Sequence, residues 1–247
     1  MAIRITSKTK SATLRPTSKI ELINYVRQEI DKQGPDADLN HIDVSKIEDM
    51  SKLFAEQKIG NIKIEYWDVS NVTSMSNMFY NCKRFNADLS RWDVGNVTDM
   101  TALFSNCYKF NSNLSDWNVS NVTNMGSMFS NCTLFEGTGL DRWNTSSVTT
   151  IRYMFFSCKQ LDTDLSRGDV SNVTDMEGMF GGCDVFEGTG LDRWDVSNVW
   201  NMFCMFVDCK QLDTDLREWD VSNVTNNVNF AKGCSKSFLN KLPKFND

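Results

Sequence analysis

Apolar residues recur along the chain in one pattern that repeats about every 25 residues. The head of each copy is tryptophan in six copies, isoleucine in the first and glycine in the sixth, and successive heads are 25 or 26 residues apart. The eight heads are Ile42, Trp67, Trp92, Trp117, Trp143, Gly168, Trp194 and Trp219. Units of this size are too small to bury an apolar face alone, so they bury it by stacking on their neighbours.

Two shorter periodicities alternate within each unit. Around each head, as in Leu89-x-x-Trp92-x-Val94, the apolar alternation predicts a short strand with Trp92 and Val94 on one face. The equivalent segments are Leu39–Val44, Ile64–Val69, Leu114–Val119, Leu140–Thr145, Leu165–Val170, Leu191–Val196 and Leu216–Val221.

After each head, the apolar spacing changes to that of a short helix. In the second copy Thr73 stands where an N-cap would, and the apolar stripe consists of Val72, Met75, Met78, Phe79 and Cys82. The chain is therefore predicted to be an α/β protein, a right-handed leucine-rich-repeat-like solenoid of about eight repeats. A parallel sheet would form one side of it and short helices the other.

The repeats divide the chain into three parts. Residues 1–38 precede the repeats and are expected to form an N-terminal cap, with a helix over about 18–33. Its signals are the capping box Ser18-x-x-Glu21, an apolar stripe at Ile20, Ile23 and Ile30, and a stop at Gly34. The repeat region is expected over 39–238, and residues 239–247 form a C-terminal tail.

The pattern W-D-V-S-N-V-T-x-M-x-x-M-F-x-x-C-x-x-F-N-x-D-L-S resembles the bacterial BspA-type leucine-rich-repeat proteins, in the subgroup once catalogued as a domain of unknown function. The resemblance covers about residues 39–238. It implies a surface or secreted protein involved in adhesion and host contact, and it brings no catalytic residues.

Charge and hydropathy narrow the choice of partner and location. The net charge of −6 argues against nucleic acid, whose phosphates favour a basic surface. No apolar run approaches the roughly 20 residues of a membrane span. The first residues lack the apolar core of a secretory signal, so the chain as it stands is predicted to be cytoplasmic, or surface-exposed or secreted if a signal has been removed.

Several polar groups suggest chemistry, but each has a plainer explanation in the repeat. Seven of the eight cysteines fall fifteen residues after a head, which favours buried structural thiols over zinc or disulfides, although both stay open. Asn and Asp before the strands, as at Asn86 and Asp88, suggest turn caps, with calcium as a weaker alternative. His41 is the only histidine, and no nucleophile motif or phosphate-binding loop is present, so we expect no enzyme, no metal and no cofactor.

The outward side of the predicted helices is the first candidate binding surface. Two nearly identical stretches of sequence differ sharply there: each has its own set of bulky residues, and the predicted helix between them has Gly178 and Gly181. This contrast predicts a groove for a protein partner or a homodimer seam, formed by Arg152, Tyr153, Phe156, Trp200, Phe203, Cys204 and Val207. Packing of these side chains on one another is the plainer alternative.

The predicted sheet face is a second, weaker candidate. It has rows of acidic and basic residues that could contact a partner or simply pair with each other, among them Arg91, Asp93, Arg142, Arg167, Asp169, Arg193 and Asp195. The function that fits best is a non-catalytic scaffold for protein binding, of an adhesion or receptor-like kind. The alternative is a structural scaffold that associates with itself through the helix-side aromatic residues.

Overall fold

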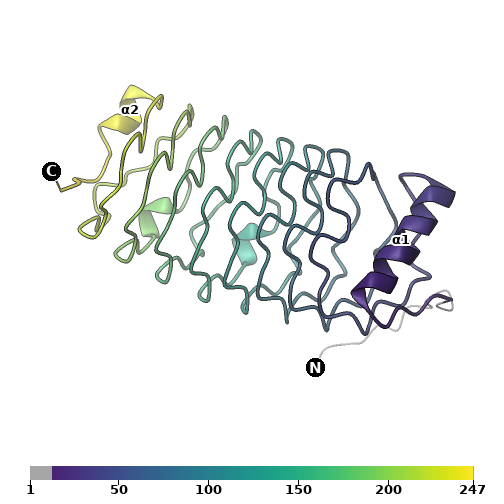
Figure 1. Cartoon of the computed structure of the whole chain (residues 1–247). Helices are drawn as coiled ribbons and strands as arrows, with labels where there is room; N and C mark the ends of the chain where they lie inside the picture. The colour runs from purple at the N-terminus through teal and green to yellow at the C-terminus, as the bar shows by residue number, and fades with distance from the viewer. Residues whose placement is uncertain (1–12, 247) are drawn as a thin grey trace.

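The computed structural model describes residues 13–246 as an elongated stack of irregular turns with a helix at each end (Figure 1). The helices are α1 (Lys19–Gln33) and α2 (Lys236–Leu239), and two 3-10 turns, η1 (Leu140–Arg142) and η2 (Leu191–Arg193), lie between them. We call each 25- or 26-residue repeat a rung. Residues 1–12 of the expected cap, and residue 247 of the expected tail, lie outside the described part of the chain.

The predicted fold class is wrong. In residues 13–246 no strand and no sheet form, and only isolated parallel bridges link successive rungs, so a right-handed leucine-rich-repeat solenoid with a parallel sheet and short helices is not supported. Between Asp49 and Asn226 these bridges join one residue per rung, seven residues after each head. The regular pairing thus lies where a helix was predicted. The segments predicted as strands instead each contain a turn, which the head N–H closes by donating to the carbonyl three residues before it, and Ile42 is the one residue of these segments that forms a bridge within residues 13–246.

Consecutive turns replace the predicted helices because two residues of every rung have positive φ. The first such position lies ten residues after the head, as in Asn77 (φ 57°) and Ala102 (φ 51°), and the second lies four residues later, as in Asn81 (φ 59°) and Asn106 (φ 63°). An α-helix cannot contain left-handed residues at this interval. The Met-x-x-Met-Phe-x-x-Cys spacing therefore reflects successive three-residue turns.

Backbone hydrogen bonds in this segment alternate between the same rung and the next one. Bonds within the rung close each turn, as from Met78 N to the Met75 oxygen (3.0 Å). Bonds to the next rung come from every second N–H: Met75 to Asp99 (3.0 Å), Asn77 to Thr101 (2.7 Å), Phe79 to Leu103 (3.0 Å) and Asn81 to Ser105 (2.8 Å). Thr73 is not a helix cap, since its hydroxyl donates to the Glu48 carbonyl of the preceding rung (3.2 Å).

Polar side chains hold the backbone directly after each head in place. The Asp93 carboxylate accepts the N–H of Gly95, two residues further on (3.1 Å). In most other rungs the Asp or Asn after the head likewise accepts the N–H two residues further on. The Asn96 amide donates to the Ser70 carbonyl of the preceding rung (2.6 Å). Side-chain caps and cross-rung amide bonds thus do the work that strand pairing was expected to do.

Helix α1 covers the first rung at one end of the stack. Ser18 accepts the Glu21 N–H at its start (3.3 Å), and Gly34 with φ 89° ends it. The predicted apolar stripe of this helix was partly wrong. Ile20 is 73% exposed, and the residues that the helix buries are Leu22 and Val26. At the other end Phe238 of α2 is buried and packs edge-on against Phe206 (5.8 Å between ring centres).

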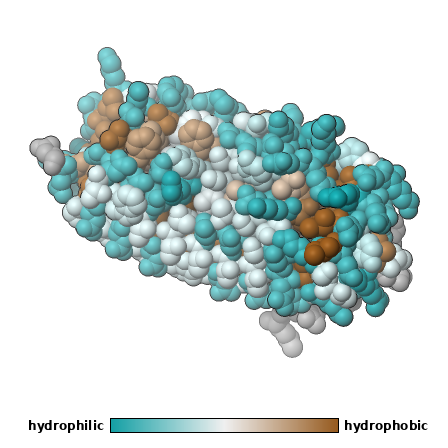
Figure 2. Space-filling model, in the orientation of Figure 1, coloured by the Kyte–Doolittle hydropathy of each residue, from teal (hydrophilic) through white to brown (hydrophobic). Residues whose placement is uncertain are grey.

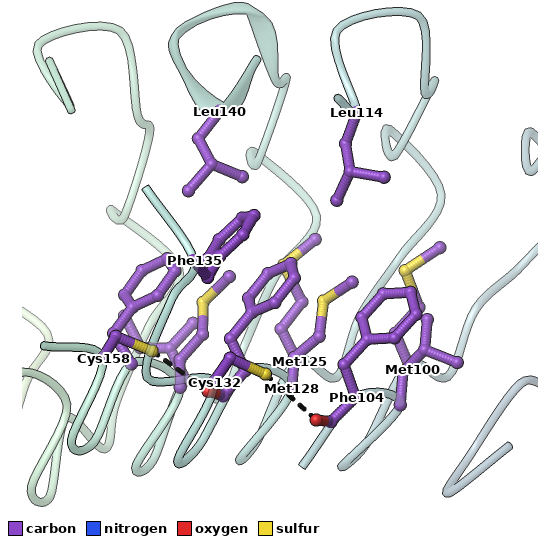
Figure 3. Packing of buried hydrophobic residues seen from close by; sticks show 14 of the residues in the cluster. Met100, Phe104, Leu114, Met125, Met128, Cys132, Phe135, Leu140 and Cys158 are labelled. Carbon is purple, nitrogen blue, oxygen red and sulfur yellow. Dashed lines mark hydrogen bonds between the residues drawn. The ribbon is translucent and has the colours of Figure 1, made fainter. Parts of the chain in front are cut away.

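The core consists of aromatic and sulfur columns that run along the stack. The tryptophan column, formed by the six tryptophan heads, is buried. Each indole N–H donates to the carbonyl three residues before the preceding head at 2.8–3.2 Å. Phenylalanines of successive rungs stack on one another next to this column, as Phe79 and Phe104 do with their ring centres 5.7 Å apart. Figure 3 shows this packing for the central rungs.

The cysteine column runs beside the phenylalanines. Each of its thiols donates to the carbonyl of a phenylalanine one rung back at 2.9–3.1 Å, as Cys132 does to Phe104 (Figure 3). Its members are Cys82, Cys107, Cys132, Cys158, Cys183, Cys209 and Cys234. All eight cysteines of the chain are free thiols, and burial raises the pKa of each thiol in this column, to about 12 at Cys82 and about 11 at Cys234.

We predict that Ala102→Gly stabilises the protein by about 0.5–1 kcal/mol. Among the positive-φ residues of the described part of the chain, Ala102 is the only alanine, and removing its Cβ relieves a strain of roughly 1–2 kcal/mol, against a smaller entropic cost of glycine. The free energy of unfolding from urea titration measures the change. The control is Ala87→Gly, at a buried alanine outside the positive-φ set, which should destabilise the protein; equal losses in both variants would contradict the role of the left-handed positions.

We predict that the fold weakens above about pH 9. The buried thiols have a raised pKa in the folded chain and roughly 8.5 when unfolded, so their contribution is complete below the unfolded pKa. It is lost as pH rises toward the folded pKa, at up to about 1.4 kcal/mol per pH unit for each thiol. Urea unfolding at pH 8, 9 and 10 measures the slope, which Cys132→Ser should make shallower; identical slopes in the two proteins would refute the prediction.

Candidate functional site

The seven residues predicted on the helix side lie in the turn segments of two rungs. Arg152 and Trp200 are exposed, and the others are half-buried. The rung between these two contains Gly178 and Gly181, the glycines that were expected to form the bottom of a groove. The side-chain contacts across these three rungs decide which of the seven residues are free to meet a partner.

Arg152 and Tyr153 belong to a polar network within the molecule. The Arg152 guanidinium contacts Asp175 (3.2 Å) and Glu177 (2.6 Å), and the Tyr153 hydroxyl hydrogen-bonds to Glu177. The Asn201 amide donates to Asp175 (2.9 Å), which links all three rungs. Asp175 and Asn201 are buried, so the network is structural, and its acidic and amide members were not identified from the sequence because their columns look like ordinary turn residues.

The electrostatics of Tyr153 fit this structural role. Burial, followed by the hydrogen bond to the Glu177 carboxylate, raises the pKa of Tyr153 to about 12. Its hydroxyl therefore stays protonated and donates to Glu177. A phenol held in this state serves as a hydrogen-bond donor and not as a base near neutral pH.

The predicted groove is wrong because neighbouring side chains fill the space above the glycines. A Cβ on Gly178 would lie 2.3 Å from a ring carbon of Tyr153. A Cβ on Gly181 would lie 2.9 Å from Val207 and 3.0 Å from Phe156. The two bulky rungs thus close over the glycine rung, as in the plainer alternative.

What stays accessible is a smaller apolar surface toward the C-terminal end, which we call the C-terminal apolar patch. Trp200 is 48% exposed and Val228, which the sequence analysis did not identify, is 57% exposed. Phe203, Cys204 and Val207 beside them are half-buried. Figure 2 shows hydrophobic side chains gathered at this end of the stack.

The charged residues flanking the heads lie on the surface without forming the expected pairs. Within residues 13–246 no ion pair joins the arginines of this face to its acidic row. The exposed residues are Arg91, Asp93, Arg142, Arg167, Asp169, Arg193 and Asp195. Bonds from the Ser171 and Ser197 side chains lower the pKa of Asp169 and Asp195, so these carboxylates remain charged caps of their own turns.

The asparagine and aspartate turns also act as caps. The Asn86 side chain accepts the Asn111 N–H (2.8 Å), and Asp88 accepts the Ser90 N–H (3.0 Å). In the described part of the chain, no group of three His, Cys, Asp or Glu residues is arranged to hold a metal ion. None of the helices in residues 13–246 is both long and apolar enough to cross a membrane.

Comparison with known families gives one match. The family model described as "Mycoplasma protein of unknown function, DUF285" matches residues 25–139 and again residues 126–245. No curated protein matches the chain. Because the two matches together span nearly all of the repeats, the chain belongs to the family described as Mycoplasma protein of unknown function, DUF285.

Proposed function

We propose that the protein is a non-catalytic scaffold that binds another protein, and that the C-terminal apolar patch is its contact surface. The observation that carries the proposal is the exposure of Trp200 and Val228 on neighbouring rungs, since exposed aromatic and aliphatic clusters are typical of protein contact sites. The resemblance of the repeat to BspA-type proteins favours adhesion or receptor-like recognition as the kind of binding.

The neighbouring contacts support the choice of this patch over the rest of the predicted site. Arg152 and Tyr153 have their polar groups engaged within the molecule, whereas the Trp200 side chain is half exposed. The patch spans two neighbouring rungs, because the Cys204 N–H donates to the Val228 carbonyl (3.0 Å). A partner that covers it would bury a large aromatic anchor, the kind of residue that contributes most to binding energy.

We predict that Trp200→Ser strongly weakens binding and leaves the fold intact. The experiment selects peptides from a random display library on the immobilised protein and measures the affinity of the selected peptides for each variant. Trp200→Ser should weaken binding at least tenfold, because it removes the aromatic side chain that a bound partner would bury. Its free energy of unfolding should change by no more than about 0.5 kcal/mol, as at other exposed sites.

Tyr66→Ser is the matched control, because Tyr66 is 43% exposed and lies outside the patch. It should keep full binding. Selected peptides that bind both variants equally would rule out the patch as the contact surface. Sedimentation of the protein alone distinguishes the alternative scaffold, since self-association through the patch would give a dimer that Trp200→Ser converts to a monomer.

A further inference from the structure

The tryptophan column has one gap, at Gly168. Where six other heads place an indole in the core, this rung leaves a cavity in which about 50 Å³ is open to the centre of a water molecule. Side chains from three successive rungs line it: Trp143, Ile151, Met154, Phe155, Leu165 and Trp194. The cavity goes beyond the proposed function, because it shares no lining residue with the C-terminal apolar patch.

The walls of the cavity have the geometry of an indole site. Neighbouring indoles stack nearly parallel at 6.5 Å elsewhere in the column, as in Trp67 with Trp92 and Trp117 with Trp143. Trp143 and Trp194 are two rungs apart, so one ring position lies empty between them. Phe155 forms the floor and lacks the tilted indole neighbour that Phe129 and Phe180 have at 6.3 and 6.1 Å.

The backbone provides a hydrogen-bond acceptor at the same place. In every other rung pair the indole N–H donates to the carbonyl three residues before the preceding head, as Trp143 does to Leu114 (3.2 Å) and Trp194 to Leu165 (3.0 Å). The corresponding carbonyl for position 168 is that of Leu140, a lining residue of the cavity. It accepts the backbone N–H of Trp143 (3.1 Å) and has a second lone pair for a donor.

The cavity is slightly open to the surface, because two of its lining residues are more exposed than most residues of the core. Met154 is 4% exposed, whereas the equivalent Met128 and Met205 are fully buried, and Leu165 reaches 8%. Water suits the space poorly, because a buried water needs two to four polar partners and the lining is almost wholly apolar. An apolar molecule that enters would bury its rings against aromatic neighbours on three sides.

We propose that the gap at Gly168 binds a free, planar, bicyclic aromatic molecule of the indole class. Its ring lies between Trp143 and Trp194 on Phe155, and its single N–H donates to the Leu140 carbonyl. A free molecule fits better than a side chain of a partner protein. The apolar lining residues are each at most 8% exposed, so the opening leaves little room for an attached main chain.

The test titrates the full chain with indole by ligand-observed NMR and by thermal unfolding. Indole should bind the wild-type protein and raise its Tm. Indene, a ring of the same shape without the N–H, should bind about tenfold more weakly, since one neutral hydrogen bond is lost. Gly168→Trp should have a higher Tm without ligand and should not bind indole, because its side chain occupies the site.

A second variant keeps the test decisive if Gly168→Trp does not fold. Ile151→Met introduces the residue that Met125 and Met176 supply at this place in neighbouring rungs, and it narrows the cavity. It should fold normally and bind indole several-fold more weakly.

Four results would overturn the proposal. Absence of indole binding by the wild-type chain would refute the site, and so would equal binding by wild type and the filled variants. Indene binding as tight as that of indole would refute the contact with the Leu140 carbonyl. N-acetyltryptophanamide binding as tightly as indole would overturn the free molecule as the ligand and would favour a tryptophan side chain of a partner.

Discussion

The constraint on which the rest of this structure depends is the alternation of backbone hydrogen bonds in the turn segments. Every second N–H donates to the next rung, and the intervening ones close turns within the rung. This alternation requires left-handed residues ten and fourteen positions after every head, a requirement that holds for all eight rungs. Once it is met, the spacing between rungs is fixed, and the aromatic rings of the core columns stack with their centres 5.3–6.5 Å apart.

The sequence predicted the repeat and the burial of its columns but not the local conformation. The six tryptophan heads lie in the core as the period implied, and so does the cysteine column except for the half-buried Cys234. The apolar spacing at Met75, Met78 and Phe79 is equally compatible with a helix and with successive turns, and the residues that decide between them are polar. Asparagine at 77 and 81 tolerates positive φ, a signal that could have excluded the helix.

The candidate site was predictable only where it depends on composition. The clustered bulky residues Tyr153, Phe156 and Phe203 indicated an unusual surface. The repeat pattern does not show which side chains occupy the space above a glycine of the neighbouring rung. The network through Asp175 and Glu177 also depends on contacts between rungs, 24 to 26 residues apart in sequence. Val228 was missed because a lone valine carries no pattern until its neighbours are known.

A stack held by repeated backbone bonds tolerates departures at individual side chains, because each rung contacts only its neighbours. Gly168 keeps the rung's turn, since its N–H donates to the Leu165 carbonyl (3.0 Å) as Trp92 N–H does to Leu89 (3.1 Å). The backbone of the rung is therefore independent of the indole. The loss of one indole empties a volume and removes one donor from the Leu140 carbonyl, but it leaves the backbone bond of the turn in place. In such an architecture the positions that depart from the repeat are the ones whose chemistry the fold itself does not require, and specific recognition is expected at those positions.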